Sequence, residues 1–167
     1  LLGKSIVLVE SDQIPEDWNN FWSRAKQGYV FIINRNIEAM VWRYLDNPNK
    51  YKLITLRKDK VLIGYLVCRN IHDEETKRIV IADYLILPGE EKSLFNGINH
   101  IINRAFKVGA TQVELWCVEN SPYFKVFFKK GFFSRGIIPV ICYQNEFAEQ
   151  VENCTSWHFT IGDSDNI

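Results

Sequence analysis

Residues 120–132, NSPYFKVFFKKGF, give the clearest indication of the architecture. Ser121 and Pro122 are typical of a helix start, because a serine side chain caps the first turn and proline fits its first position. The pattern predicts a helix to about Lys130, which Gly131 ends. Apolar, extended runs stand on both sides, at 112–118 and 133–143. A strand, a helix and another strand in this order predict a parallel crossover.

Further upstream, three extended runs separated by short polar loops predict an antiparallel meander: Tyr51–Arg57, Val61–Arg69 and Arg78–Leu87. Pro88 and Gly89 end the third run. Glu91–Val108 follows as the longest predicted helix, with apolar residues recurring on one face. Gly109 stands where a left-handed C-terminal cap is expected.

The two ends of the chain complete the predicted order. Residues 17–25 and 36–45 have the apolar spacing of short amphipathic helices, a leading strand is expected at 6–9, and a last one at 156–160. The sequence therefore predicts an α/β fold with a mixed sheet, as a single domain over residues 1–167. Residue 1 is Leu and the only methionine is Met40, so we expect a fragment of a longer chain.

Composition narrows the classes of function. Lys plus Arg and Asp plus Glu each total 20, so the net charge is zero and no basic stripe favours nucleic acid as a partner. No run approaches the roughly 18 apolar residues of a membrane span. The four cysteines form no CxxC pair or disulfide framework, which indicates reduced thiols in a cytoplasmic protein. The three histidines, His72, His100 and His158, have no metal-ligand spacing, so we expect no metal.

This order of elements resembles the GNAT acyltransferase superfamily over nearly the whole chain. Asn120, followed by a helix and then by Gly131-Phe132 at the start of the next strand, is similar to a family motif. Ile86-Leu87-Pro88 resembles the Val-x-Pro that closes the family's fourth strand. Trp42-Arg43-Tyr44 and the tail Trp157–Asp165 resemble a poorly characterised bacterial subgroup.

The resemblance implies a donor site for acetyl-CoA between the runs 78–87 and 112–118. Backbone groups of the first run would pair with the pantetheine arm, and the turn before the long helix would hold the pyrophosphate, because free N–H groups and the helix dipole favour an anion there. The expected donor-binding residues are Leu85, Ile86, Leu87, Gly89, Lys92, Ser93, Asn120 and Phe127.

Two departures from the family pattern bear on that site. GNAT enzymes usually carry Arg/Gln-x-x-Gly-x-Gly/Ala at the turn, whereas this chain has a shorter loop in which Glu90 and Glu91 would repel a pyrophosphate. Phe127 stands where the family's tyrosine would protonate the departing thiolate. Tyr123, one turn earlier, could replace it, or could be a core aromatic with its hydroxyl at the rim. We therefore expect this fragment alone to bind acetyl-CoA weakly.

Acyl transfer to an amine also needs a base. Asp83 shares strand parity with apolar residues, and burial would raise its pKa into a useful range. In the alternative interpretation Asp83 is structural and bonds to backbone or to an arginine such as Arg43. Glu114, beside Trp116, is the second candidate base.

Three hypotheses remain open. The first is an acyl-CoA-dependent N-acyltransferase for a small amine or amino sugar, working alone or with an upstream GNAT-like domain. The second is a degenerate GNAT-like domain without acetyl-CoA binding, which binds the acceptor or packs on a partner domain. The third is a FemAB-like aminoacyltransferase built from two such halves.

Overall fold

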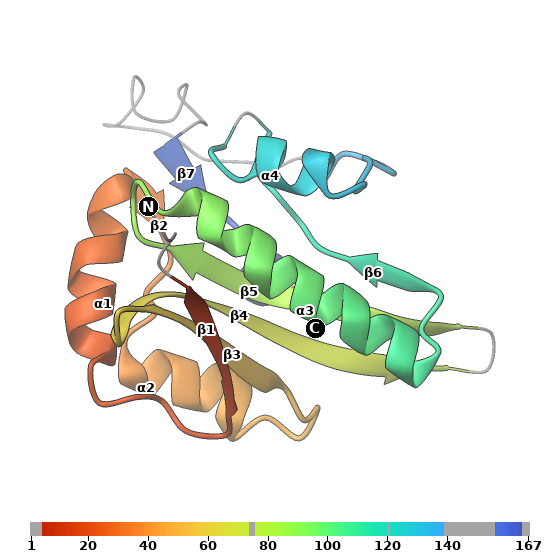
Figure 1. The fold of residues 1–167 in the computed structure, drawn as a ribbon, viewed down its shortest axis with the longest axis horizontal. Coiled ribbons are helices and arrows are strands. Elements are labelled where there is room, and N and C mark those ends of the chain that lie inside the picture. The colour runs from red at the N-terminus through yellow and green to blue at the C-terminus, as the bar shows by residue number, and fades with distance from the viewer. Residues whose placement is uncertain (1–4, 74–75, 120, 139–155, 165–167) are drawn as a thin grey trace.

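The computed structural model describes residues 5–73, 76–119, 121–138 and 156–164 (Figure 1). Its main sheet has five strands in the order β1-β3-β4-β5-β6: β1 (Ile6–Ser11), β3 (Lys52–Lys58), β4 (Val61–His72), β5 (Lys77–Ile86) and β6 (Gln112–Glu114). The first three pairings are antiparallel, and β5 pairs with β6 in parallel. The predicted meander and the parallel strand after the long helix are both confirmed.

The β3–β4 hairpin follows from the backbone of its two turn residues. Asp59 and Lys60 have φ values of 51° and 68° between the paired residues Lys58 and Val61. Positive φ at both central positions is the mark of a type I′ turn, whose twist matches that of the two strands. The polar triplet that separates the apolar runs is therefore a tight hairpin turn.

Successive residues of β4 point to opposite faces of the sheet, and each face carries a helix. Tyr65 packs against Trp18 of α1 (Trp18–Ala25), with 4.8 Å between ring centroids. Leu66 points the other way, against Gly97 of α3 (Leu94–Val108), where an added Cβ would lie 2.3 Å from the leucine side chain. The sheet is thus covered on both faces, and Figure 1 shows α3 lying along it.

The remaining helices are short. Asn36 caps α2 (Ile37–Met40) by accepting from the Ala39 N–H, and a π-helical segment, η2 (Val41–Leu45), continues it. A 3-10 turn, η3 (Glu91–Ser93), leads into α3, whose C-cap Gly109 has the predicted left-handed φ of 68°. The predicted helix after Pro122 is observed as α4 (Phe124–Lys129).

The pairing of β5 with its two neighbours, β4 and β6, is irregular in two ways. Val67 pairs with Asp83 and Cys68 with Ile81, so Ala82 is an extra residue in a β-bulge. In addition, β6 pairs only with residues Arg78–Val80 and then diverges from β5 (Figure 1). The predicted strand to Val118 is therefore too long. Within the residues predicted as strand, the Trp116 carbonyl accepts from the Tyr84 hydroxyl at 2.9 Å and is not part of the strand ladder.

The end of the chain differs most from expectation. Residues 133–138 form no strand, and Phe133 and Ile137 are 77% and 87% exposed; the rest of the predicted strand, 139–143, lies outside the described residues. The last predicted strand is only β7 (Trp157–His158). It pairs in parallel with β2 (Phe31–Ile32), in a separate two-stranded sheet, and a 3-10 turn η5 (Ile161–Asp163) follows. No described helix is long and apolar enough to cross a bilayer.

Candidate active site

The backbone of β5 beyond the bulge is a candidate ligand site, because no described strand pairs with its outer edge there. Alternate residues direct their N–H and C=O groups to opposite sides. The Leu87 N–H donates to the Ile63 carbonyl of β4 at 2.8 Å, and Leu85 has the same parity. The backbone groups of Leu85 and Leu87 therefore face β4, and the contact of these two residues with a donor stays a prediction. Ile86, with Tyr84, faces the outer edge.

Tyr123 occupies both backbone groups of Ile86. Its hydroxyl accepts from the Ile86 N–H at 3.1 Å and donates to the Ile86 carbonyl at 3.2 Å, while Tyr29 donates to it at 2.6 Å. Tyr123 is buried, and burial together with the Tyr29 hydroxyl raises its pKa well above the usual value. The alternative interpretation of Tyr123 as a core aromatic placed its hydroxyl at the rim, whereas the hydroxyl is buried and bonded. It fastens the start of α4 to β5.

Tyr84 is also held by contacts within the chain. Its N–H donates to Asp83 Oδ1 at 2.9 Å, and its ring packs edge-on against His158 of β7 at 5.3 Å. His158 also has a backbone hydrogen bond with Tyr84, yet its Nε2 has no hydrogen-bond partner among the described residues. Burial, followed by the nearby charge of Arg35, lowers the pKa of His158 to about 3. The ring is therefore neutral at ordinary pH.

Asp83 is fully buried, as its strand parity predicted, and it faces a different arginine from the one expected. Arg35 Nε lies 3.0 Å from Oδ2 and Arg35 Nη2 lies 3.1 Å from Oδ1, in a forked pair. Tyr65 and Thr160 donate hydroxyl bonds to the same carboxylate at 2.8 and 3.2 Å. Burial acts to raise the pKa of Asp83, but the charge of Arg35 and the hydrogen bonds from Arg35 and Tyr65 outweigh it. The pKa lies below its usual value, so the expected upward shift is wrong.

A second carboxylate completes this group. Arg35 Nη2 donates to Asp163 Oδ2 at 2.6 Å, and Arg43 Nη1 donates to Asp163 Oδ1 at 3.2 Å. Burial raises the pKa of Asp163 despite the attraction of Arg35. We call Arg35, Arg43, Asp83 and Asp163 the buried ion cluster. Its charges balance, which fits the structural interpretation of Asp83.

The turn before α3 already holds a carboxylate of its own. The Gly89 N–H, at a residue with φ of 88°, donates to Glu91 Oε1 at 2.8 Å. The Glu90 N–H donates to the Leu87 carbonyl, and the Ser93 N–H to the Glu90 carbonyl. Glu90 in turn pairs with Lys58. Three of the N–H groups that an anion would need at this turn therefore have intramolecular acceptors.

The other predicted site residues are dispersed. Lys92 is exposed, and the Ser93 hydroxyl donates to Glu90 Oε2 at 3.3 Å. Phe127 is buried against Tyr84 at 5.0 Å, so its ring belongs to the core.

Glu114 has a 41% exposed side chain, 3.4 Å from Arg78 Nε. Asn120 lies outside the described residues. Within the described ranges, no group of three His, Cys, Asp or Glu side chains could hold a metal ion.

Sequence reasoning missed Arg35, Thr160 and Asp163. Arg35 lies between two asparagines in an irregular link, where no hydrophobic period reveals which side chains are buried. Thr160 and Asp163 belong to the tail, where neither the predicted strand 156–160 nor the similarity to a subgroup indicates a role for either residue. The one available signal was Asp83 itself, because a carboxylate on an apolar strand face requires a buried cation.

No sequence family model and no curated protein matches the chain. Solved structures do match. A ribosomal-protein-alanine N-acetyltransferase from Brucella melitensis biovar Abortus 2308 has a TM-score of 0.63 at 10% identity, over 84% of this chain and 99% of that one.

An aminoglycoside N-acetyltransferase in complex with CoA has a TM-score of 0.57 at 16% identity, over 86% and 97%. Glucosamine-6-phosphate N-acetyltransferase from Arabidopsis thaliana has a TM-score of 0.56 at 12% identity, over 85% and 100%. These likenesses extend over more than four fifths of the chain and include its mixed sheet: the chain has the GNAT acyltransferase fold.

Proposed function

We propose that this chain is the catalytic domain of an acyl-CoA-dependent N-acyltransferase that acts on a small amine or amino sugar. The observation that carries the proposal is the divergence of β6 from β5 beyond Val80, next to the bulge at Ala82. No described strand pairs with the outer edge of β5 at Tyr84 and Ile86, so an extended ligand that displaces the Tyr123 hydroxyl from Ile86 has room to pair there. The names of two solved structures with this fold, the aminoglycoside and glucosamine-6-phosphate N-acetyltransferases, support the substrate class.

Among the three predicted catalytic residues, Glu114 fits the role of base best. Asp83 has a lowered pKa and four partners, so it is a poor proton acceptor. The Tyr123 hydroxyl has its bonding capacity filled by Ile86 and Tyr29. Glu114 is half-exposed beside the point where β5 and β6 separate, and its single ion pair is long. We assign the proton transfer to Glu114 and a structural role to Asp83.

Calorimetric titration with acetyl-CoA, together with CoA release in the presence of amino sugars and aminoglycosides, tests this proposal. We expect saturable binding and amine-dependent release. Glu114→Gln should reduce the release with little effect on stability, because the exposed pair contributes at most about 1 kcal/mol. No release with any amine, despite acetyl-CoA binding, would contradict the assigned activity.

Two contacts favour a second candidate, a GNAT-like domain that binds no acetyl-CoA and serves as an acceptor-binding or packing module. Glu91 holds the Gly89 N–H, and Tyr123 holds both backbone groups of Ile86. A donor would have to displace both residues. Each charge-assisted bond that is not formed costs about 1.5–3 kcal/mol, so two could weaken binding by hundreds-fold.

Glu91→Gly separates the two candidates. It frees the Gly89 N–H and removes a negative charge from the turn, so it should tighten acetyl-CoA binding by about tenfold. Glu90→Gly is the matched control. It removes the same charge but also frees Lys58 and leaves Gly89 bound to Glu91, so we expect a smaller gain. If both variants fail to bind acetyl-CoA, the shortened loop itself prevents binding and the second candidate stands.

A further inference from the structure

A cavity of about 360 Å³ lies at the opposite end of the sheet from the turn at Gly89. The four cations that line it are Lys50, Lys52, Arg69 and Arg104, and the side-chain amides of Asn49 and Asn70 complete its polar wall. All six can donate hydrogen bonds, and none of the described residues that line the cavity carries a carboxylate. Lys52 pairs with Cys68 across β3 and β4, and Arg69 with Val80 across β4 and β5, well away from Ile86.

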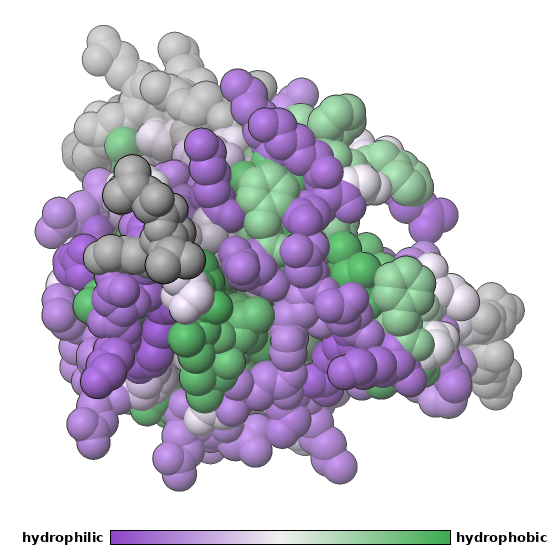
Figure 2. Space-filling view, viewed as in Figure 1, coloured by the Kyte–Doolittle hydropathy of each residue, from purple (hydrophilic) through white to green (hydrophobic). Residues whose placement is uncertain are grey.

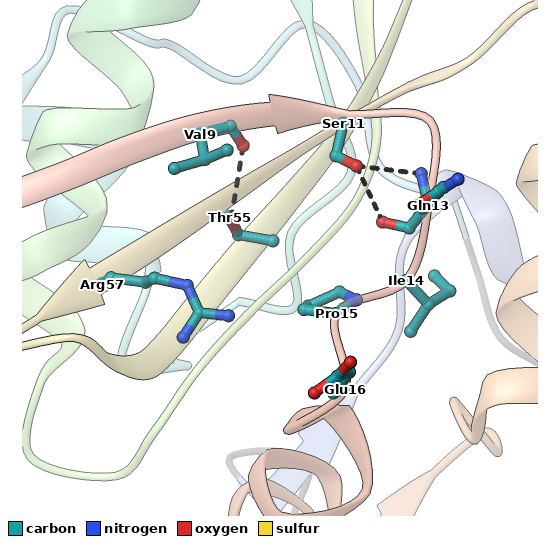
Figure 3. A pocket seen from close by; sticks show the side chains of 8 residues that line it. All are labelled: Val9, Ser11, Gln13, Ile14, Pro15, Glu16, Thr55 and Arg57. Carbon is teal, nitrogen blue, oxygen red and sulfur yellow. Dashed lines mark hydrogen bonds between the residues drawn. The ribbon is translucent and has the colours of Figure 1, made fainter.

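A second cavity, of about 220 Å³, differs because its serine, threonine and arginine side chains have partners within the chain (Figure 3). There Ser11 bonds with the Gln13 backbone and Thr55 with the Val9 carbonyl. Arg57 is held by both oxygens of Asp17. Its only lining cation among the described residues, Arg57, is therefore compensated by a carboxylate of the chain.

The cations of the larger cavity are only partly compensated. Asp12 pairs with Lys52 at 2.7 Å, and Glu10 pairs with Arg104 at 3.1 Å. Among the described residues, no carboxylate pairs with Lys50 or Arg69. Two positive charges at this cavity therefore have no counter-charge from the part of the chain that the structure describes.

Two buried donors also lack an acceptor. Arg69 Nε and Arg104 Nε, both shielded from solvent, have no hydrogen-bond partner within the described part of the chain. Arg69 is held in place over the Tyr51 ring, 5.6 Å from its centroid. An unsatisfied buried donor is costly, and a bound acceptor atom removes that cost.

The loop that supplies Lys50 is fixed in an unusual conformation. Lys50 has a φ of 54°, which is uncommon for a residue other than glycine. Asn47 holds the loop by accepting from the Asn49 N–H at 2.9 Å through its side chain. Strain of this kind persists where the surroundings determine it, and it is concentrated at sites with a function.

We propose that this cavity binds the phosphate group of a small phosphorylated molecule. A phosphate monoester carries close to two negative charges at neutral pH and three strong acceptor oxygens, which matches the two uncompensated cations and the unpaired Nε donors. Arginine is the side chain best suited to hold such a group, because its planar fork fits phosphate geometry. The site is separate from the proposed donor site and does not depend on acyl transfer.

Calorimetry at low, constant ionic strength tests the site, with inorganic phosphate and glucose 6-phosphate as probes and glucose and chloride as controls. We expect saturable binding of both phosphate probes and none of the controls. Arg69→Gln and Arg104→Gln should each weaken binding by about tenfold or more, since each removes charge-assisted bonds. Arg24→Gln, an exposed arginine of α1, should change nothing.

Lys50→Gln tests the site in a variant that should fold normally, because Lys50 is exposed and its replacement leaves the core intact. It should weaken phosphate binding without changing the melting temperature. Binding of glucose 6-phosphate but not of inorganic phosphate would still support the site and would show that the sugar is part of the ligand. The proposal is overturned if neither probe binds saturably, or if Lys50→Gln and Arg69→Gln bind phosphate as tightly as Arg24→Gln does.

Discussion

At the scale of single residues, Asp83 shows how burial and pairing compete over one carboxylate. Burial alone would have made it a base of raised pKa, as its position on an apolar strand face suggested. Arg35, placed 48 residues earlier in the chain, reverses the direction of that shift. The pairing lowers the energy of the ionised form, which is the opposite of what a base needs. We therefore assign Asp83 a structural role instead of the role of a base.

Asp83→Asn should lower the free energy of unfolding by about 3 kcal/mol or more, because Arg35 loses half of its counter-charge in a buried place. Urea unfolding measures the change. Asp17→Asn is the control, since its pair with Arg57 is part-exposed and contributes at most about 1 kcal/mol. An unchanged stability with abolished acyl transfer would return Asp83 to the role of base.

His158 should make the fold sensitive to acid. Its pKa is about 3 in the folded chain and about 6.5 when unfolded, so between these values the unfolded state binds one more proton. Stability is therefore full above pH 6.5 and falls by about 1.4 kcal/mol per pH unit below it. The pKa of Asp83 is also lowered, and its contribution is lost at lower pH still.

Unfolding midpoints between pH 4 and pH 7, for the parent chain and for His158→Gln, check this assignment. The variant should lose most of the slope in that range. His72→Gln is the matched control, because His72 is exposed at the end of β4. A slope that survives in His158→Gln and disappears in His72→Gln would contradict the assignment.

At the scale of elements, the sequence predicted strands and helices where the hydrophobic pattern extends over many residues and the element that pairs or packs with it is near in the chain. The three runs of the meander, the long helix and its Gly109 cap are confirmed for that reason. The failures share a different feature. Residues 115–118 and 133–138 have strand-like composition, but a side chain, Tyr84, takes the Trp116 carbonyl, and 133–138 are exposed. Composition alone does not show whether a sheet edge is free.

Tyr123 is the contact that fastens α4 to β5, so Tyr123→Phe should destabilise the chain by about 1–3 kcal/mol, because it leaves both backbone groups of Ile86 without a partner. Chemical unfolding measures this loss. Tyr29→Phe, which removes only the bond to Tyr123, should cost less. If Tyr123 instead supplies the proton to the leaving thiolate, Tyr123→Phe would lower amine-dependent CoA release and leave stability unchanged.

At the scale of the whole molecule, the buried ion cluster joins parts that are far apart in the sequence. Arg35 follows β2, Asp83 lies in β5 and Asp163 lies in η5, after β7. The two-residue pairing of β2 with β7 is too short to hold the end of the chain alone. We therefore expect the docking of residues 156–164 onto the sheet to depend on Arg35, which contacts both carboxylates.

Arg35→Gln should release this end of the chain while the meander stays folded. Hydrogen exchange followed by mass spectrometry should show faster exchange at β2, β7 and η5, and unchanged protection in β3 and β4, whose ladders are long and buried. Arg57→Gln removes an arginine from a part-exposed pair with Asp17 and should leave β7 and η5 protected. Uniform loss of protection would mean that the cluster stabilises the entire domain. Unchanged exchange at β7 and η5 would mean that apolar contacts, such as the packing of His158 on Tyr84 and Tyr123, hold the C-terminal segment without it.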